Sequence, residues 1–246
     1  MKRLFALIKR NLKEILRDPL SLIFMLAMPL LMEVLFYFIF HNMTAQFEMK
    51  YLAPGIVVFA QAFLSLFAGI LIAMDRGSAF LTRLYVSRAK APEFILGYAL
   101  SLLPIALAQS ILFFLVGGLI DHSLFSVGMI YGILLSLVPS FFFIGLGILL
   151  GSLCNEKSIG GVASILIMGQ SLLSGMWFPP EGLGEGVLIA MRVLPFKNAT
   201  DLLQGGFMGY ASAFHDFWRP LLILLTYAVV VFVVAVFVFK RKMQEK

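Results

Sequence analysis

Six long apolar stretches constrain the fold of this sequence more than any other feature. They cover residues 20–40, 52–74, 94–120, 128–153, 158–176 and 220–239. A helix needs about 20 such residues to cross a bilayer, and each stretch approaches or exceeds that length. None alternates with the period of two that a transmembrane barrel strand requires. We therefore predict an all-α integral membrane protein with six transmembrane helices, in one transmembrane domain over residues 1–246.

The composition and the distribution of charge support this prediction. Hydrophobic residues make up 61% of the chain and charged residues 13%, whereas soluble domains carry about 25% charged residues. Of the 19 Lys and Arg residues, all but Lys50, Arg192, Lys197 and Arg219 fall on the side that holds both termini. The positive-inside rule then predicts a multi-pass protein of the cell (inner) membrane with cytoplasmic termini. The same asymmetry explains the net charge of +6, so we predict no nucleic-acid partner.

Residues 1–18 are predicted to form an amphipathic helix at the cytoplasmic interface. At 100° per residue the apolar side chains occupy one half of the helix, and the basic ones, Arg10 among them, occupy the other half. The basic half suits the headgroups of membrane lipids. Asp18-Pro19 should then turn the chain into the first span. The helix is either a simple anchor or a mechanical element that touches a partner.

The cytoplasmic loop over residues 75–92 is the second element outside the spans. Its apolar side chains recur at one-face helical spacing among basic residues, which predicts a short amphipathic helix. The residues we expect to contact a partner are Arg76, Phe80, Leu81, Arg83, Leu84 and Tyr85. The alternative is that this helix only lies on the lipid surface.

The outer segment over residues 177–219 is the longest loop. It contains two short apolar stretches, residues 187–194 and 202–208, and either Asn198 or Thr200 could cap the second. Both are too short to cross the membrane. We expect a pair of re-entrant helices that dip into the outer leaflet.

The sequence offers no catalytic or cofactor chemistry. A phosphate-binding loop of the form G-x-x-x-x-G-K-[ST] is excluded because the dipeptide Gly-Lys never occurs. No zinc-helix motif and no nucleophile elbow is present, and the single Cys154 has no nearby His. We therefore expect neither an enzyme nor a metal or cofactor in this chain.

Six polar residues inside the spans share one depth on the outer side of the midpoint: Glu33, Gln61, Gln109, Gln170, Thr226 and Tyr227. A carboxyl at that depth is costly, so Glu33 should be protonated or hydrogen-bonded to one of these amides. The layer either lines a translocation path or holds the helices together. In the fourth span the spacings Gly128-x-x-x-Gly132 and Gly147-x-x-x-Gly151 predict close helix packing, either within one chain or between chains.

The sequence resembles the permease subunit of type-2 ABC exporters over essentially its whole length. The resemblance rests on Asp75-Arg76-Gly77-Ser78, on Glu93-Phe94-Ile95-Leu96-Gly97-Tyr98, and on Ser174-Gly175-Met176-Trp177-Phe178-Pro179. It implies an interfacial helix, six spans, a coupling helix between spans two and three, and re-entrant helices between spans five and six. It also implies a second permease, either an identical copy in a homodimer or a related chain. Two separate ATP-binding cassette subunits would then bind ATP and Mg.

The resemblance further implies a cavity lined by spans two and five. Here that set is Phe59, Phe63, Phe67, Met168, Leu172 and Met176, to which we add the polar Glu33, Gln61 and Gln170. Such a wall suits an amphipathic or hydrophobic substrate, such as a drug, antibiotic, lipid or peptide, and suggests multidrug export. The alternatives are a polysaccharide exporter permease, an ATP-independent channel and a small integral membrane enzyme.

Overall fold

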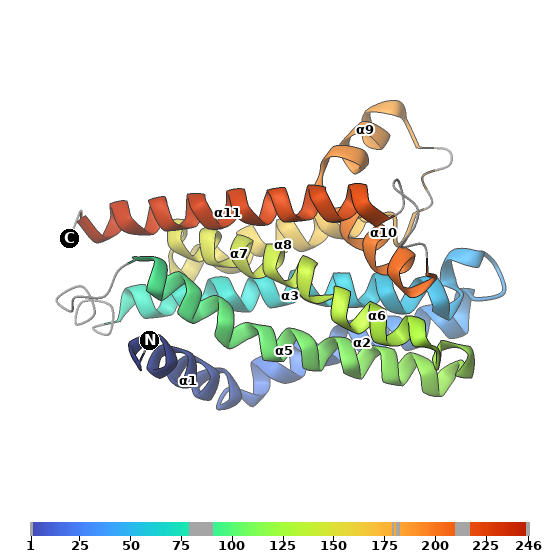
Figure 1. Cartoon of the computed structure of the whole chain (residues 1–246), viewed down its shortest axis with the longest axis horizontal. Coiled ribbons are helices and arrows are strands. Elements are labelled where there is room, and N and C mark those ends of the chain that lie inside the picture. Colours follow the sequence, from blue (N-terminus) through green and yellow to red (C-terminus); the bar gives the residue numbers. More distant parts are fainter. Residues whose placement is uncertain (1, 79–90, 179, 181–182, 210–216, 245–246) are drawn as a thin grey trace.

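The computed structural model describes residues 2–78, 91–178, 180, 183–209 and 217–244. Every regular element in these ranges is a helix, so the all-α prediction is confirmed. The long helices lie side by side along one direction, and both termini lie near the same end of the bundle (Figure 1). We call it the terminus-bearing end and the opposite one the far end.

Ten helices and two short 3₁₀ turns are present in the described ranges. They are α1 (Lys2–Leu16), α2 (Pro19–Phe40), η1 (Ala45–Phe47), α3 (Met49–Gly77), α5 (Ala91–Ile120), η2 (His122–Leu124), α6 (Val127–Leu135), α7 (Leu137–Leu153), α8 (Glu156–Leu173), α9 (Glu185–Val193), α10 (Pro195–Phe207) and α11 (Arg219–Gln244). Five helical segments among the described residues are long and apolar enough to span a membrane: α2, α3, α5, α6 with α7, and α11. The sixth span remains a prediction that falls on α8.

Helix α8 differs from the predicted span over residues 158–176 at both ends. It begins in a capping box between Asn155 and Ser158, so Glu156 and Lys157 lie in its first turn. It ends at Leu173 because Gly175, with φ of 69°, adopts the left-handed conformation that terminates helices. Met176 therefore lies beyond the helix.

Helix α3 is the most buried of the candidate spans, and α7 approaches it at backbone distance. A Cβ atom placed on Gly147 would lie 2.1 Å from the carbonyl oxygen of Ser65. One placed on Gly151 would lie 2.4 Å from the carbonyl oxygen of Gly69. Only glycine fits at such distances, so the predicted close packing is confirmed, and it occurs within the chain.

The terminus-bearing end confirms the predicted N-terminal helix and the turn that follows it. Asp18 caps α2 by accepting a hydrogen bond of 3.1 Å from the Ser21 amide, and Pro19 occupies the first helical position. Helix α1 packs on α5 where Gly97 leaves room for Leu7. This packing fixes which side of α1 faces the protein.

At the far end the two short outer helices are present as α9 and α10, but the predicted start of the second was wrong. Helix α10 begins at Pro195, whose fixed φ suits the first helical position, and neither Asn198 nor Thr200 caps it. The Asn198 amide instead donates to the Leu194 carbonyl at 2.7 Å. Helix α10 is largely buried, whereas α9 exposes most of its residues. Their depth in a leaflet stays a prediction.

Candidate functional site

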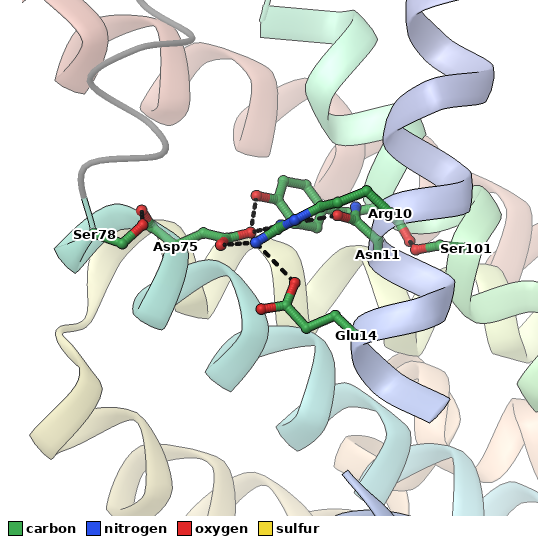
Figure 2. Close-up of polar contacts among 7 residues, drawn as sticks. Arg10, Asn11, Glu14, Asp75, Ser78 and Ser101 are labelled. Carbon is green, nitrogen blue, oxygen red and sulfur yellow. Dashed lines mark hydrogen bonds and ion pairs between the residues drawn. The ribbon is translucent and has the colours of Figure 1, made fainter. Parts of the chain in front are cut away.

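Two adjacent residues at the end of α3 hold the helices of the terminus-bearing end together. Only Gly77 and Ser78 separate Asp75 and Arg76 from the segment 79–90, on which most of the predicted coupling residues fall. Figure 2 shows the Arg10 side chain reaching from α1 toward the Asp75 carboxylate on α3. The two residues are neighbours in sequence but contact different helices. Asp75 contacts α1 and α5, and Arg76 contacts the end of α7. We call this pair of residues the junction.

The Asp75 carboxylate receives three hydrogen bonds. Arg10 binds it in a bidentate manner, with Nη2 donating to Oδ1 at 2.6 Å and Nη1 donating to Oδ2. The Tyr98 hydroxyl of α5 donates to Oδ2 at 2.6 Å. The Asp75 side chain is only 4% exposed, so these donors take the place of water around its oxygen atoms. The carboxylate thus joins α1, α3 and α5.

Arg10 also belongs to a short polar network on α1. Its guanidinium lies 2.8 Å from the Glu14 carboxylate and donates to the Asn11 amide oxygen at 3.0 Å. Burial opposes the charge of the guanidinium, but the hydrogen bond and charge of Asp75 outweigh it and raise the pKa of Arg10. Burial raises the pKa of Glu14, and Arg10 opposes that change. We refer to Arg10, Glu14, Asp75 and Tyr98 as the polar clasp.

Arg76 binds the opposite side of the junction. Its Nη1 donates to the carbonyl oxygens of Gly151 at 2.9 Å and Cys154 at 3.1 Å, and also to that of Ser152. The last carbonyls of a helix have no partner within that helix and carry partial negative charge. The Arg76 guanidinium therefore caps α7 and fixes the turn into α8.

The comparison with protein families agrees with this architecture. The family described as ABC-2 type transporter matches residues 2–208, which include the clasp, the segment 79–90 and both short outer helices. This chain belongs to the ABC-2 type transporter family. It is accordingly a multi-pass membrane component of a transporter, and the family implies association with ATP-binding cassette subunits. No curated protein matched the sequence.

Of the coupling residues predicted in this ABC-2 protein, only Arg76 lies within the described residues. Its guanidinium donates hydrogen bonds to the backbone carbonyls at the end of α7. The other five, Phe80, Leu81, Arg83, Leu84 and Tyr85, lie outside the described residues. Their role at a partner stays a prediction.

The predicted path residues do not form one surface in the single chain. Glu33, Phe59, Gln61, Gln170 and Met176 are buried, Phe63 and Phe67 are partly buried, and Met168 and Leu172 are exposed. Met176 packs against Gly55, where an added Cβ atom would lie 2.7 Å from its side chain. Their role as a substrate path stays a prediction.

Two of the intramembrane amides connect helices through backbone carbonyls. Gln109 donates to the Met25 carbonyl at 3.3 Å, across the gap between α5 and α2. That carbonyl lacks its usual partner because Pro29, four residues later, has no N–H. Gln61 donates to the Ser136 carbonyl at 2.9 Å, where α6 meets α7. Both contacts are typical of polar residues that hold transmembrane helices together.

Glu33 was predicted to be either protonated or hydrogen-bonded to one of these amides, and the second alternative is wrong for the described residues. Glu33 is fully buried, and neither carboxylate oxygen has a hydrogen-bond partner among the described residues. Gln61 and Gln109 direct their N–H groups to backbone carbonyls instead, while the Gln170 side chain also lacks a partner in the described part of the chain. Glu33 lies beside Gly117, whose missing side chain leaves space for the carboxyl group.

Sequence reasoning missed the clasp, although its residues were in view. Asp75 and Tyr98 both belong to the segments that carry the family resemblance, yet nothing in their spacing showed that they meet. Arg10 was placed on the lipid-facing basic half of the first helix, whereas it points into the protein. The sequence carried no signal for this orientation. The helix neighbours Leu7 and Asn11 are both buried, which suggests that Arg10 faces the protein, but burial is known only from the structure.

Proposed function

We propose that this chain is the permease subunit of an ATP-driven exporter for an amphipathic or hydrophobic substrate. The observation that carries the proposal is the junction of Asp75 and Arg76. It connects the predicted coupling segment to α1 and α5 on one side and to α7 and α8 on the other. A membrane component without a phosphate-binding loop needs a separate ATPase as its source of energy. ATP and Mg would then be held by two partner subunits on the cytoplasmic side.

The junction gives a direct route for motion. Closure of the ATPase subunits would press on residues 79–90 and displace the end of α3. Asp75 would transfer that displacement to α1 and α5 through the polar clasp, and Arg76 would transfer it to α7 and α8. Packed helices move as rigid bodies, so a small shift at this end changes the arrangement of the bundle along its length.

The exposed face of α8 supports a second permease in the assembly. Ile165, Met168 and Leu172 are 75%, 66% and 46% exposed, and they share one face of the helix. In a homodimer with six spans per chain and cytoplasmic termini, this face would border a cavity shared by the two copies. An apolar wall containing a flexible methionine accepts varied hydrophobic substrates.

Affinity purification of the full chain from its native membrane tests the proposal. An ATP-binding cassette subunit should co-purify with the wild-type chain and should be lost from a variant carrying Leu84→Asp and Tyr85→Asp. The matched control is Met43→Asp, because Met43 is exposed at the far end and outside the helices. The control should retain the ATPase.

Two results would contradict the proposal. One is retention of the ATPase by the Leu84→Asp and Tyr85→Asp variant when that variant is folded, as judged by size-exclusion chromatography. The other is transport of a fluorescent amphiphile by liposomes that contain the purified chain alone, which would indicate an ATP-independent channel.

A further inference from the structure

A small apolar cavity lies between α2 and α3 near the terminus-bearing end. Its volume is about 160 Å³, and α1 and α5 close it on the other sides. The apolar lining includes Leu22, Met25, Phe67, Leu71, Met74 and Leu102. A space of this size admits part of one acyl chain and excludes a whole lipid.

The entrance of the cavity carries charges of both signs. Glu14 and Asp18 line it, and they also line an adjoining open hollow along α1. That hollow is also lined by Ala6 and Arg10, and by Lys9, Lys13 and Arg17, which recur at intervals of four residues on one face of the helix. None of these three cations forms an ion pair with a described residue.

We propose that the cavity and the hollow form one binding site for a phospholipid with a zwitterionic, primary-ammonium headgroup. One acyl chain occupies the apolar cavity. The phosphate lies against Lys13 and Arg17, and the ammonium group donates to the carboxylates of Glu14 and Asp18. This site does not depend on the direction of transport or on the identity of the exported substrate.

Charge complementarity selects this headgroup among membrane lipids. A headgroup with only negative charge would contact the lysines but would also face two carboxylates. A choline headgroup has no N–H to donate, whereas a primary ammonium has three. Asp18 is exposed, and its pKa is lowered by hydrogen bonds from Ser21, so the carboxylate is charged at neutral pH.

The lipid would bind next to the polar clasp. Glu14 is common to both, because it lines the cavity and lies 2.8 Å from the Arg10 guanidinium. An ammonium group bound to the Glu14 carboxylate would compete with the Arg10 guanidinium for it. Arg10 would then interact mainly with the Asp75 carboxylate. Occupancy of the site would therefore tighten the connection between α1 and α3.

Native mass spectrometry of the delipidated full-length protein tests the site. Phosphatidylethanolamine, phosphatidylcholine and phosphatidylglycerol with identical acyl chains are added in turn, and the bound fraction is compared. We expect retention of the ethanolamine lipid to exceed that of the other two by roughly fivefold or more, since charged hydrogen bonds contribute about a decade of affinity each.

Three variants separate the parts of the site. Asp18→Asn keeps a residue that can cap α2 but removes one of the two carboxylates, so it should reduce the preference for ethanolamine over choline. Lys13→Gln removes a contact to the phosphate that all three lipids share, so it should lower the retention of each of them. Leu102→Trp should fill the cavity and lower the retention of all three lipids, whereas the control Arg192→Gln, exposed on α9, should change nothing.

Equal retention of the three lipids by the wild-type protein would overturn the proposal. A preference for phosphatidylglycerol would also overturn it, because it would show an anionic-lipid patch on α1 instead of a mixed-charge site. Unchanged binding in folded Leu102→Trp would show that no acyl chain enters the cavity. These results leave the proposed export function unaffected, since that function is tested by ATPase co-purification.

Discussion

The polar clasp makes a quantitative prediction for the variant Arg10→Met. Methionine keeps much of the apolar stem of arginine and the helical conformation but removes the two hydrogen bonds to Asp75. The buried Asp75 carboxylate would then be left with the Tyr98 hydroxyl as its only side-chain donor in the described structure. The variant therefore measures how strongly the clasp depends on this pair.

Removing one partner from a fully buried ion pair costs about 3–5 kcal/mol. Arg10 retains 31% of its side-chain exposure, so water at the interface relieves part of this cost and about 2–3 kcal/mol remains. For a chain of this size each kcal/mol lowers the midpoint of thermal unfolding by roughly 2–4 °C. Arg10→Met should therefore lower Tm by about 4–12 °C.

The assay is thermal unfolding of the purified protein in detergent, followed by fluorescence-detected size exclusion. Lys9→Met is the matched control, since Lys9 is exposed on the same helix, and its Tm should change by less than about 2 °C. Adding Asp75→Asn to Arg10→Met removes the unpaired charge and should restore part of the loss. Equal Tm values for Arg10→Met and Lys9→Met would refute the reasoning.

Four further predictions concern the bundle. Gly147→Ala should prevent folding or lower Tm by more than 10 °C, whereas Gly161→Ala, which faces open space, should be tolerated in the same thermal assay. Gln109→Leu leaves the Met25 carbonyl without its donor and should cost about 1–2 kcal/mol by thermal unfolding. Arg76→Gln should increase hydrogen exchange at the end of α7, without altering exchange at the end of α2. Glu33→Gln should abolish transport with normal assembly if Glu33 lines a path, whereas loss of assembly alone would indicate a structural role.

The sequence predicted those features that follow from local pattern. Apolar length located five of the spanning helices, and Asp18-Pro19 located the turn before α2 because capping and proline geometry act over a few residues. The spacing of Gly147 and Gly151 predicted close packing because small residues four apart share one face. These signals need no knowledge of the partner helix.

The features that the sequence did not predict depend on long-range contacts. Asp75 and Arg10 are 65 residues apart in the sequence, and no periodic pattern predicts that they form a pair. Gln109 binds Met25 only because Pro29 frees a carbonyl on a different helix. The end of α8 was missed because Gly175 was counted as part of an apolar run, whereas its backbone conformation stops the helix.

The most direct test of the central claim is hydrogen exchange on the permease bound to its ATPase, with and without ATP and vanadate. The claim is that force on residues 79–90 reaches α1 through the Arg10–Asp75 contact. In the wild-type complex, nucleotide should change exchange in residues 79–90 and in α1 together. In Arg10→Met the response of residues 79–90 should persist and that of α1 should disappear. An unchanged response of α1 in Arg10→Met would contradict the account.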